Sequence, residues 1–150
     1  MSVSDPTDDK ILRILGREGR ITNQALAGHV GLSPSATLRR VQAMEASGLI
    51  RGYRAIIDPD RAGIGFTAYI AVGLNEHTKR AQGAFERAIA IAPEVRECHN
   101  VTGSVEYLLR VEARDLAAYK HFHTEVLGML PQVARLTTYV VMGSPKDERG

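Results

Sequence analysis

The sequence contains a single cysteine and no long apolar run, and each of these absences excludes a class of protein. Cys98 has no second cysteine with which to form an internal disulfide. No segment approaches the roughly 18 consecutive apolar residues of a membrane-spanning helix. The first ten residues also lack the apolar core of a signal peptide. We therefore expect a soluble, cytoplasmic protein that has no membrane partner.

Catalytic and metal-binding motifs are also missing from the sequence. No phosphate-binding loop, HExxH motif or Ser/His/Asp arrangement is visible. His121 and His123 are two residues apart on a predicted helix, so they do not share a face and do not form a metal site with His99. Cys98 is expected to be a buried strand residue rather than a nucleophile. We expect neither an enzyme nor a protein with a metal or another cofactor.

The first part of the chain instead carries the signals of consecutive short helices. A helix is predicted over residues 22–30, because Gly31 supplies the backbone freedom that a helix end often needs. Ser33 can cap a following helix, and Pro34 stands at its first position, where the missing N–H costs nothing. An earlier helix begins at a cap provided by Thr7 or Asp5. This spacing predicts three helices joined by tight turns.

The helix that follows Ser33 has two different faces. Leu38, Val41 and Met44 repeat at three-residue spacing and predict its buried stripe. The side chains predicted to fall largely off this stripe are Ser35, Thr37, Arg39, Arg40, Gln42 and Ala43. Short polar residues followed by arginines one turn later suit a helix that lies in the major groove of DNA. The pattern indicates a helix-turn-helix, although a plain hairpin of two helices with a solvated face has similar features.

The distribution of charge favours DNA binding over the plain hairpin. The net charge of +2 is too small to indicate non-specific binding to a polyanion. Residues 13–54, however, hold seven arginines and two glutamates, which leaves a net charge of +5. Residues 64–150 hold ten basic and ten acidic residues. A local positive excess is what phosphate contacts require.

The remaining pattern predicts an α+β chain with two domains. Residues 49–57 have the β-branched and aromatic content of a strand, so a helix-turn-helix domain that ends in a strand is predicted over residues 1–57. Turn residues mark a linker at 58–64. The second domain, 65–143, is predicted to contain strands at 66–74, 95–102, 105–111 and 133–142 and helices at 81–91 and 115–130, with a polar tail at 144–150. This βαββαβ order matches a ferredoxin-like fold.

In this fold the helices lie on one side of the sheet and leave the other face bare. We expect a second copy of the chain to cover this bare face, with Tyr69, Val72 and Leu74 in the contact.

Several motifs together resemble those of the Lrp/AsnC family of feast/famine transcriptional regulators. They are Asp8-x-x-Ile-Leu-x-x-Leu, Gly31-Leu32-Ser33-Pro34 continuing to Arg39-Arg40, Gly48-Leu49-Ile50, and Val101-Thr102-Gly103 followed by Tyr107-Leu108-Leu109. The resemblance extends from about Asp5 to Met142. It implies a winged helix-turn-helix, a linker and a ferredoxin-like domain that forms homodimers and assembles further, often to octamers. It also implies that a free amino acid binds in a cleft between dimers.

On this resemblance, double-stranded DNA and a second copy of the chain are the expected partners. The expected contacts with bases or nearby phosphates are Ser35, Ala36, Thr37, Arg39 and Arg40, and those with the phosphate backbone are Thr22, Arg51 and Arg54. Ser33 is also expected among the DNA-binding residues. The loss of Arg40 is expected to weaken specific binding by about 1–3 kcal/mol.

The expected effector-binding residues are Gly103, Ser104, Val105, Glu106, Tyr107, Thr137 and Thr138. Related sequences often have Asp-Tyr-Asp where Ser104-Val105-Glu106 stands here. Glu106 is therefore the one carboxylate of this stretch that could bind the ammonium group of an amino acid, and strand alternation can turn it away from the pocket. A ligand-independent or architectural DNA-binding protein of the same fold is the alternative.

Overall fold

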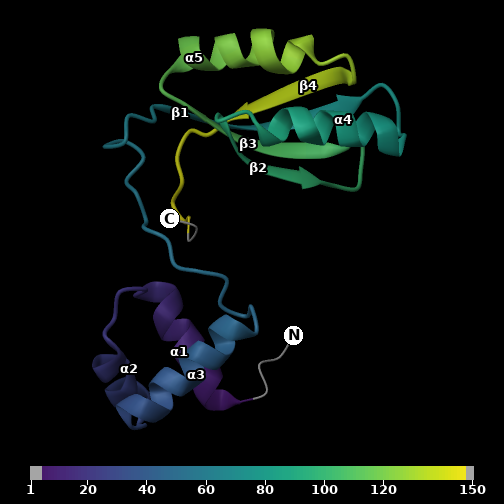
Figure 1. Cartoon of the computed structure of the whole chain (residues 1–150). Coiled ribbons are helices and arrows are strands. Elements are labelled where there is room, and N and C mark those ends of the chain that lie inside the picture. Colours follow the sequence, from purple (N-terminus) through teal and green to yellow (C-terminus); the bar gives the residue numbers. More distant parts are fainter. Residues whose placement is uncertain (1–4, 148–150) are drawn as a thin grey trace. The chain divides into compact units, whose positions relative to one another are not determined.

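The computed structural model describes residues 5–147, which form two compact units (Figure 1). The first unit ends at Ala55 and the second begins at Ile56. Within the described residues, no helix is both long and apolar enough to cross a membrane.

Three helices form the first unit: α1 (Pro6–Arg17), α2 (Asn23–Val30) and α3 (Pro34–Ala46). The side chains of Asp5, Thr22 and Ser33 accept hydrogen bonds from backbone N–H groups in the first turns, at 2.7, 3.2 and 3.2 Å. Each bond satisfies a donor that the helix itself leaves unpaired. The predicted caps at Thr22 and Ser33 are confirmed, and Asp5 rather than Thr7 caps α1.

One residue from each helix forms the centre of this unit. Ile11, Leu26 and Met44 are 0%, 2% and 5% exposed, and partly buried aliphatic side chains surround them. Because only a few side chains are fully buried, the unit depends strongly on each of them.

The strand predicted over residues 49–57 does not form in the single chain, so this prediction was wrong. Ile50 is half-buried against the helical core, and residues 51–58 have no regular secondary structure. Ile56 and Ile57 are 73% and 65% exposed. A strand is stabilised by hydrogen bonds to a neighbouring strand, and no partner strand is available to this segment within residues 5–147.

The second unit has the predicted βαββαβ order. Its elements are β1 (Phe66–Leu74), α4 (Lys79–Ala90), β2 (Val95–Asn100), β3 (Tyr107–Ala113), α5 (Leu116–His121) and β4 (Val133–Val140). The strands form one antiparallel sheet in the order β2-β3-β1-β4.

Two details of the predicted second unit were wrong. The loop between β2 and β3 spans residues 101–106 rather than a two-residue turn, and α5 continues as a π-helical turn at Phe122–Val126 and a 3-10 turn at Leu127–Met129.

Both helices of this unit cover the same face of the sheet (Figure 1). Phe85 of α4 and Phe122 beyond α5 pack with Ile70 and Val72 of β1 in one buried cluster. Val72 and Leu74 therefore belong to this core, which corrects their predicted place on the bare face. Cys98 lies on the edge strand β2 and is exposed, so it is not the buried residue that was predicted.

The opposite face of the sheet carries no helix of this unit. Cross-strand pairs there include Tyr69 with Tyr139 and Ala71 with Thr137. Tyr139 is 59% exposed. The sheet thus has the predicted bare face. Of Tyr69, Val72 and Leu74, the three residues predicted to lie on this face, only Tyr69 does so.

Candidate DNA-binding surface and effector pocket

The turn between α2 and α3 fixes the start of α3. Gly31 has a φ of 73°, in the left-handed region that glycine adopts without steric cost. The side-chain amide of Asn23, at the start of α2, donates a 2.7 Å hydrogen bond to the carbonyl of Pro34. The glycine turn and this hydrogen bond fix how α3 follows α2, and the packing of Leu26 and Met44 in the core holds the two helices together.

The buried stripe of α3 differs from the predicted one by one position. Thr37 is fully buried, and its hydroxyl donates a 3.0 Å hydrogen bond to the carbonyl of Ser33. Thr37, Val41 and Met44 follow the i, i+4, i+7 spacing of a helix face. Leu38 is 45% exposed. A fully buried side chain cannot contact DNA, so the prediction for Thr37 was wrong. The prediction that Leu38 is buried was wrong as well.

The outward face of α3 consists of Ser35, Leu38, Arg39 and Gln42. These four residues are spaced i, i+3, i+4 and i+7 and are all exposed. Ala36, the remaining residue predicted near the bases, is half-buried. This face offers hydroxyl, guanidinium and amide groups together with one apolar side chain, the functional groups with which a helix reads base edges.

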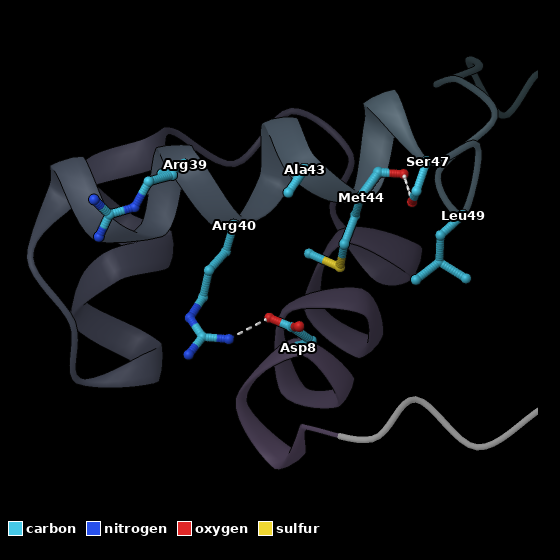
Figure 2. A pocket seen from close by; sticks show the side chains of 7 residues that line it. All are labelled: Asp8, Arg39, Arg40, Ala43, Met44, Ser47 and Leu49. Atoms are coloured by element: carbon cyan, nitrogen blue, oxygen red, sulfur yellow. Dashed lines mark hydrogen bonds and ion pairs between the residues drawn. The ribbon is translucent and has the colours of Figure 1, made fainter.

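Arg40 points to a different place from Arg39. Its Nη1 atom lies 2.8 Å from Oδ2 of Asp5 and 2.8 Å from Oδ1 of Asp8, both at the N-terminal end of α1. Figure 2 shows Arg40 reaching from α3 toward Asp8, whereas Arg39 extends away from α1. The side chain of Arg40 is 36% exposed and is engaged by these two carboxylates in the single chain. Its predicted contact with DNA stays a prediction, and such a contact would have to compete with this pairing. We call this arrangement of Arg40, Asp5 and Asp8 the α1–α3 clamp.

The clamp changes the acid–base chemistry of Asp5. The hydrogen bond from Arg40, with a second from the backbone N–H of Thr7, lowers the pKa of the Asp5 carboxyl below its ordinary value. A carboxyl whose pKa is lowered by folding stabilises the folded state above its unfolded pKa, and this contribution is lost as the pH falls through the folded pKa.

Thermal unfolding of an Arg40→Met variant tests the clamp. At pH 7 the first unit of the variant should unfold at a lower temperature than that of the unaltered protein, and the difference should shrink below about pH 3, where aspartates become protonated. Arg13→Met is the matched control, because Arg13 and Asp9 form a pair 3.4 Å apart whose side chains are 74% and 46% exposed. Such a pair contributes little. A difference that is the same at pH 7 and at pH 2.5 would exclude the clamp.

The remaining residues predicted to bind DNA are Thr22, Ser33, Arg51 and Arg54. Thr22 is exposed at the cap of α2, and Ser33 caps α3 with its hydroxyl 3.2 Å from that of Ser35. Arg51 and Arg54 are exposed in the extended segment after α3. Their contacts with DNA stay predictions.

The second unit has a pocket of about 410 Å³ at one end of its sheet. Its lining residues come from the end of β1 and the loop after it, the loop before β3, and the start of β4: Gly73, Leu74, His77, Ser104, Glu106, Ala134 and Arg135. Of the predicted effector residues, Ser104 and Glu106 line this pocket. His77 and Arg135 also line the pocket, although neither was predicted. Arg135 reaches it because the sheet register places Arg135 opposite Gly73, and His77 lies in the loop that follows β1.

Glu106 is held firmly in the pocket wall. Its Oε2 atom accepts a 2.6 Å hydrogen bond from the backbone N–H of Leu74, and its Oε1 atom lies 2.9 Å from Nδ1 of His77. Only 15% of its side chain is exposed. Arg135 donates a 2.7 Å hydrogen bond to the carbonyl of Ser104. The pocket thus brings together a carboxylate, an imidazole and a guanidinium.

Three other predicted effector residues lie elsewhere. Tyr107 is 1% exposed in the core and donates a 2.6 Å hydrogen bond to Glu86, and burial raises the pKa of its hydroxyl. Thr138 faces the helix-covered side, where its hydroxyl is hydrogen-bonded to that of Tyr119. Thr137 is exposed on the bare face. The burial of Tyr107 contradicts its predicted contact with an effector. Strand alternation turns Thr137 and Thr138 to opposite faces of the sheet, and their contacts with a ligand between dimers stay predictions.

Gly103 and Val105 lie in the loop between β2 and β3 but do not line the pocket, and Gly103 has a φ of 124°.

Among residues 5–147, no three histidine, cysteine or acidic side chains lie close enough together to hold a metal ion.

Comparisons with known proteins identify the family. Residues 67–150 match the Lrp/AsnC ligand binding domain, and residues 4–51 match a winged helix-turn-helix DNA-binding domain. The chain belongs to the Lrp/AsnC family. It is therefore a DNA-binding transcriptional regulator and not an enzyme.

Relatives of this Lrp/AsnC protein match it along most of their length. The proline dehydrogenase transcriptional activator of Rhodobacter capsulatus is 41% identical over 138 residues, which cover 92% of this chain and 90% of the relative. The leucine-responsive regulatory protein of Escherichia coli is 37% identical over 143 residues, covering 95% and 87%. A transcriptional regulator from Neisseria meningitidis, solved as a complex with L-Met, superposes with a TM-score of 0.92 at 35% identity, covering 95% of this chain and 92% of that one.

Proposed function

We propose that the chain is a cytoplasmic, sequence-specific regulator that reads duplex DNA with α3 and responds to a free amino acid bound by its second unit. The observation that carries the first part is the outward face of α3, where Ser35, Arg39 and Gln42 are exposed together. A helix capped at its N-terminus and bearing such side chains fits the major groove.

Two features support a homodimer. Tyr69, Ala71, Thr137 and Tyr139 form an aromatic patch on the bare sheet face, next to the Arg110–Glu112 ion pair of β3, and a second copy can cover this patch. The extended segment at 51–57 carries the exposed β-branched side chains of Ile56 and Ile57 and has no partner strand within the described residues 5–147, so the same segment of a second copy can pair with it. Such a dimer presents two α3 helices to half-sites about one helical turn, roughly 34 Å, or a multiple apart. Further assembly to an octamer would bring the pockets of neighbouring dimers together.

The pocket around Glu106 has the charges that a free amino acid requires. The Arg135 guanidinium can bind the α-carboxylate, and the Glu106 carboxylate can bind the α-ammonium group. The Neisseria relative, which was solved with L-Met, supports an amino acid as the class of ligand. A ligand at this position can act by shifting the assembly between states of different DNA affinity.

The hydrogen bonds of Glu106 favour a second candidate. Both carboxylate oxygens already have partners, Leu74 and His77. An ammonium group would have to compete with them. A regulator or architectural protein that binds DNA without a small-molecule effector is therefore the alternative.

Selection of duplexes from a random pool, with and without a mixture of amino acids, tests the proposal. We expect an enriched two-fold sequence, and we expect one amino acid to change the affinity for it by about 5- to 150-fold, the usual range of allosteric coupling. Arg135→Met should remove this change, and Arg96→Met on the exposed part of β2 should keep it. Enrichment with no response to any amino acid would favour the alternative, and no enrichment would exclude sequence-specific reading.

A further inference from the structure

The outward face of α3 contains one apolar side chain among its polar ones. Leu38 is 45% exposed, with Ser35 three residues before it and Gln42 four residues after it. In this turn of α3 the side chain that faces the core is that of Thr37, so Leu38 faces outward. Leu38 therefore stands on the surface that the proposed function assigns to DNA.

We propose that Leu38 is a specificity-determining residue that contacts the C5-methyl group of a thymine in the major groove. This inference rests on the proposed sequence-specific function of α3. The thymine methyl is the apolar group that base pairs present in the major groove, whereas the other features of the groove edge are hydrogen-bond donors and acceptors. An exposed leucine on the reading face has no polar group with which to satisfy those donors and acceptors, so the methyl group is its complementary partner.

The spacing of Leu38 and Gln42 indicates which base pairs of the half-site the two side chains can contact. Leu38 and Gln42 are four residues apart, which separates them by about 6 Å along the helix axis. For a helix that follows the groove, this is close to the separation of base pairs two steps apart, about 6.8 Å. Gln42 is suited to bind adenine through N6 and N7, and Arg39 to bind guanine through O6 and N7. Leu38 would thus add recognition of thymine to a surface that also reads purines.

Replacement of thymine by deoxyuridine isolates this contact, because it removes one methyl group and leaves every hydrogen-bonding atom in place. The probe is the duplex enriched by selection from a random pool, with single thymines replaced in turn. At one thymine of each half-site we expect the affinity of the unaltered protein to fall about fourfold, the effect of returning one methyl group to water. Replacement of both symmetry-related thymines should multiply the two effects.

The Leu38→Ala variant should bind the thymine and deoxyuridine duplexes with equal affinity. Leu49→Ala is the matched control, since Leu49 is 43% exposed in the same unit but lies outside the reading face. This variant should keep the fourfold difference. Leu38→Met, which retains an apolar side chain of similar reach, should keep it as well, and circular dichroism establishes that each variant is folded.

Two results would overturn the inference alone: an enriched duplex with no thymine sensitive to deoxyuridine, or the same sensitivity in the unaltered protein and in Leu38→Ala. The second result would assign the methyl contact to another residue. A selection that enriches no sequence would instead contradict the proposed function, and the inference with it.

Discussion

Replacement of Ile11 by alanine is expected to remove most of the stability of the first unit and thereby to weaken DNA binding, while the second unit keeps its stability. Ile11 is completely buried between α1, α2 and α3. Truncation of a buried isoleucine to alanine costs about 2–5 kcal/mol. A unit of this size has a total stability of roughly 3–8 kcal/mol, so most of that stability would be lost.

Amide hydrogen exchange measured by segment tests this prediction. In Ile11→Ala, amides of α1, α2 and α3 should exchange much faster than in the unaltered protein, while amides of β1, β3 and β4 keep their protection. Leu49→Ala, at a partly exposed position of the same unit, should lower the free energy of unfolding by less than Ile11→Ala does. Equal loss of protection in both units would show that they do not fold independently.

Two adjacent arginines are expected to affect DNA binding for different reasons. Arg39→Ala should weaken binding to the selected duplex by about 1–3 kcal/mol, roughly 5- to 150-fold, because it removes a side chain from the reading face. The stability of the first unit should not change. Arg40→Ala should lower that stability, because Asp5 and Asp8 lose their shared partner.

A stabilising osmolyte separates the two effects. Osmolytes such as trimethylamine N-oxide favour the folded state, so they should reduce the binding defect of Arg40→Ala and leave that of Arg39→Ala unchanged. Fluorescence anisotropy at fixed salt measures both affinities. If Arg40→Ala binds as weakly as Arg39→Ala with and without the osmolyte, Arg40 contacts DNA directly and the clamp is not its main role.

The local signals in the sequence were sufficient for the helices of the first unit. Thr22, Gly31 and Ser33 act on backbone groups within a few residues, so their roles follow from the sequence without knowledge of the rest of the fold. The order of strands and helices in the second unit could also be predicted, because each element has its own apolar periodicity.

The contacts of α3 could not be predicted in the same way. A buried threonine that bonds its own helix backbone looks polar in the sequence, and this moved the predicted stripe from Thr37 to Leu38. Arg40 binds residues 35 and 32 positions earlier in the chain. No local pattern distinguishes this arginine from its neighbour Arg39.

Predictions that depend on pairing failed for a related reason. The 49–57 segment has the composition of a strand, but a strand forms only beside a partner. In the second unit, the place of Arg135 beside Gly73 follows from the sheet register. Such pairings are set by the fold as a whole, and the effector pocket could therefore be only partly anticipated.

Dimethyl sulfate footprinting of the selected duplex tests most directly whether the outward face of α3 enters the major groove. The reagent methylates guanine at N7, in the major groove, and adenine at N3, in the minor groove. We predict protection of guanine N7 in two patches about one helical turn or a multiple apart, with this protection lost in Arg39→Ala. Protection confined to adenine N3, or guanine N7 protection that is unaffected by Arg39→Ala, would contradict the account.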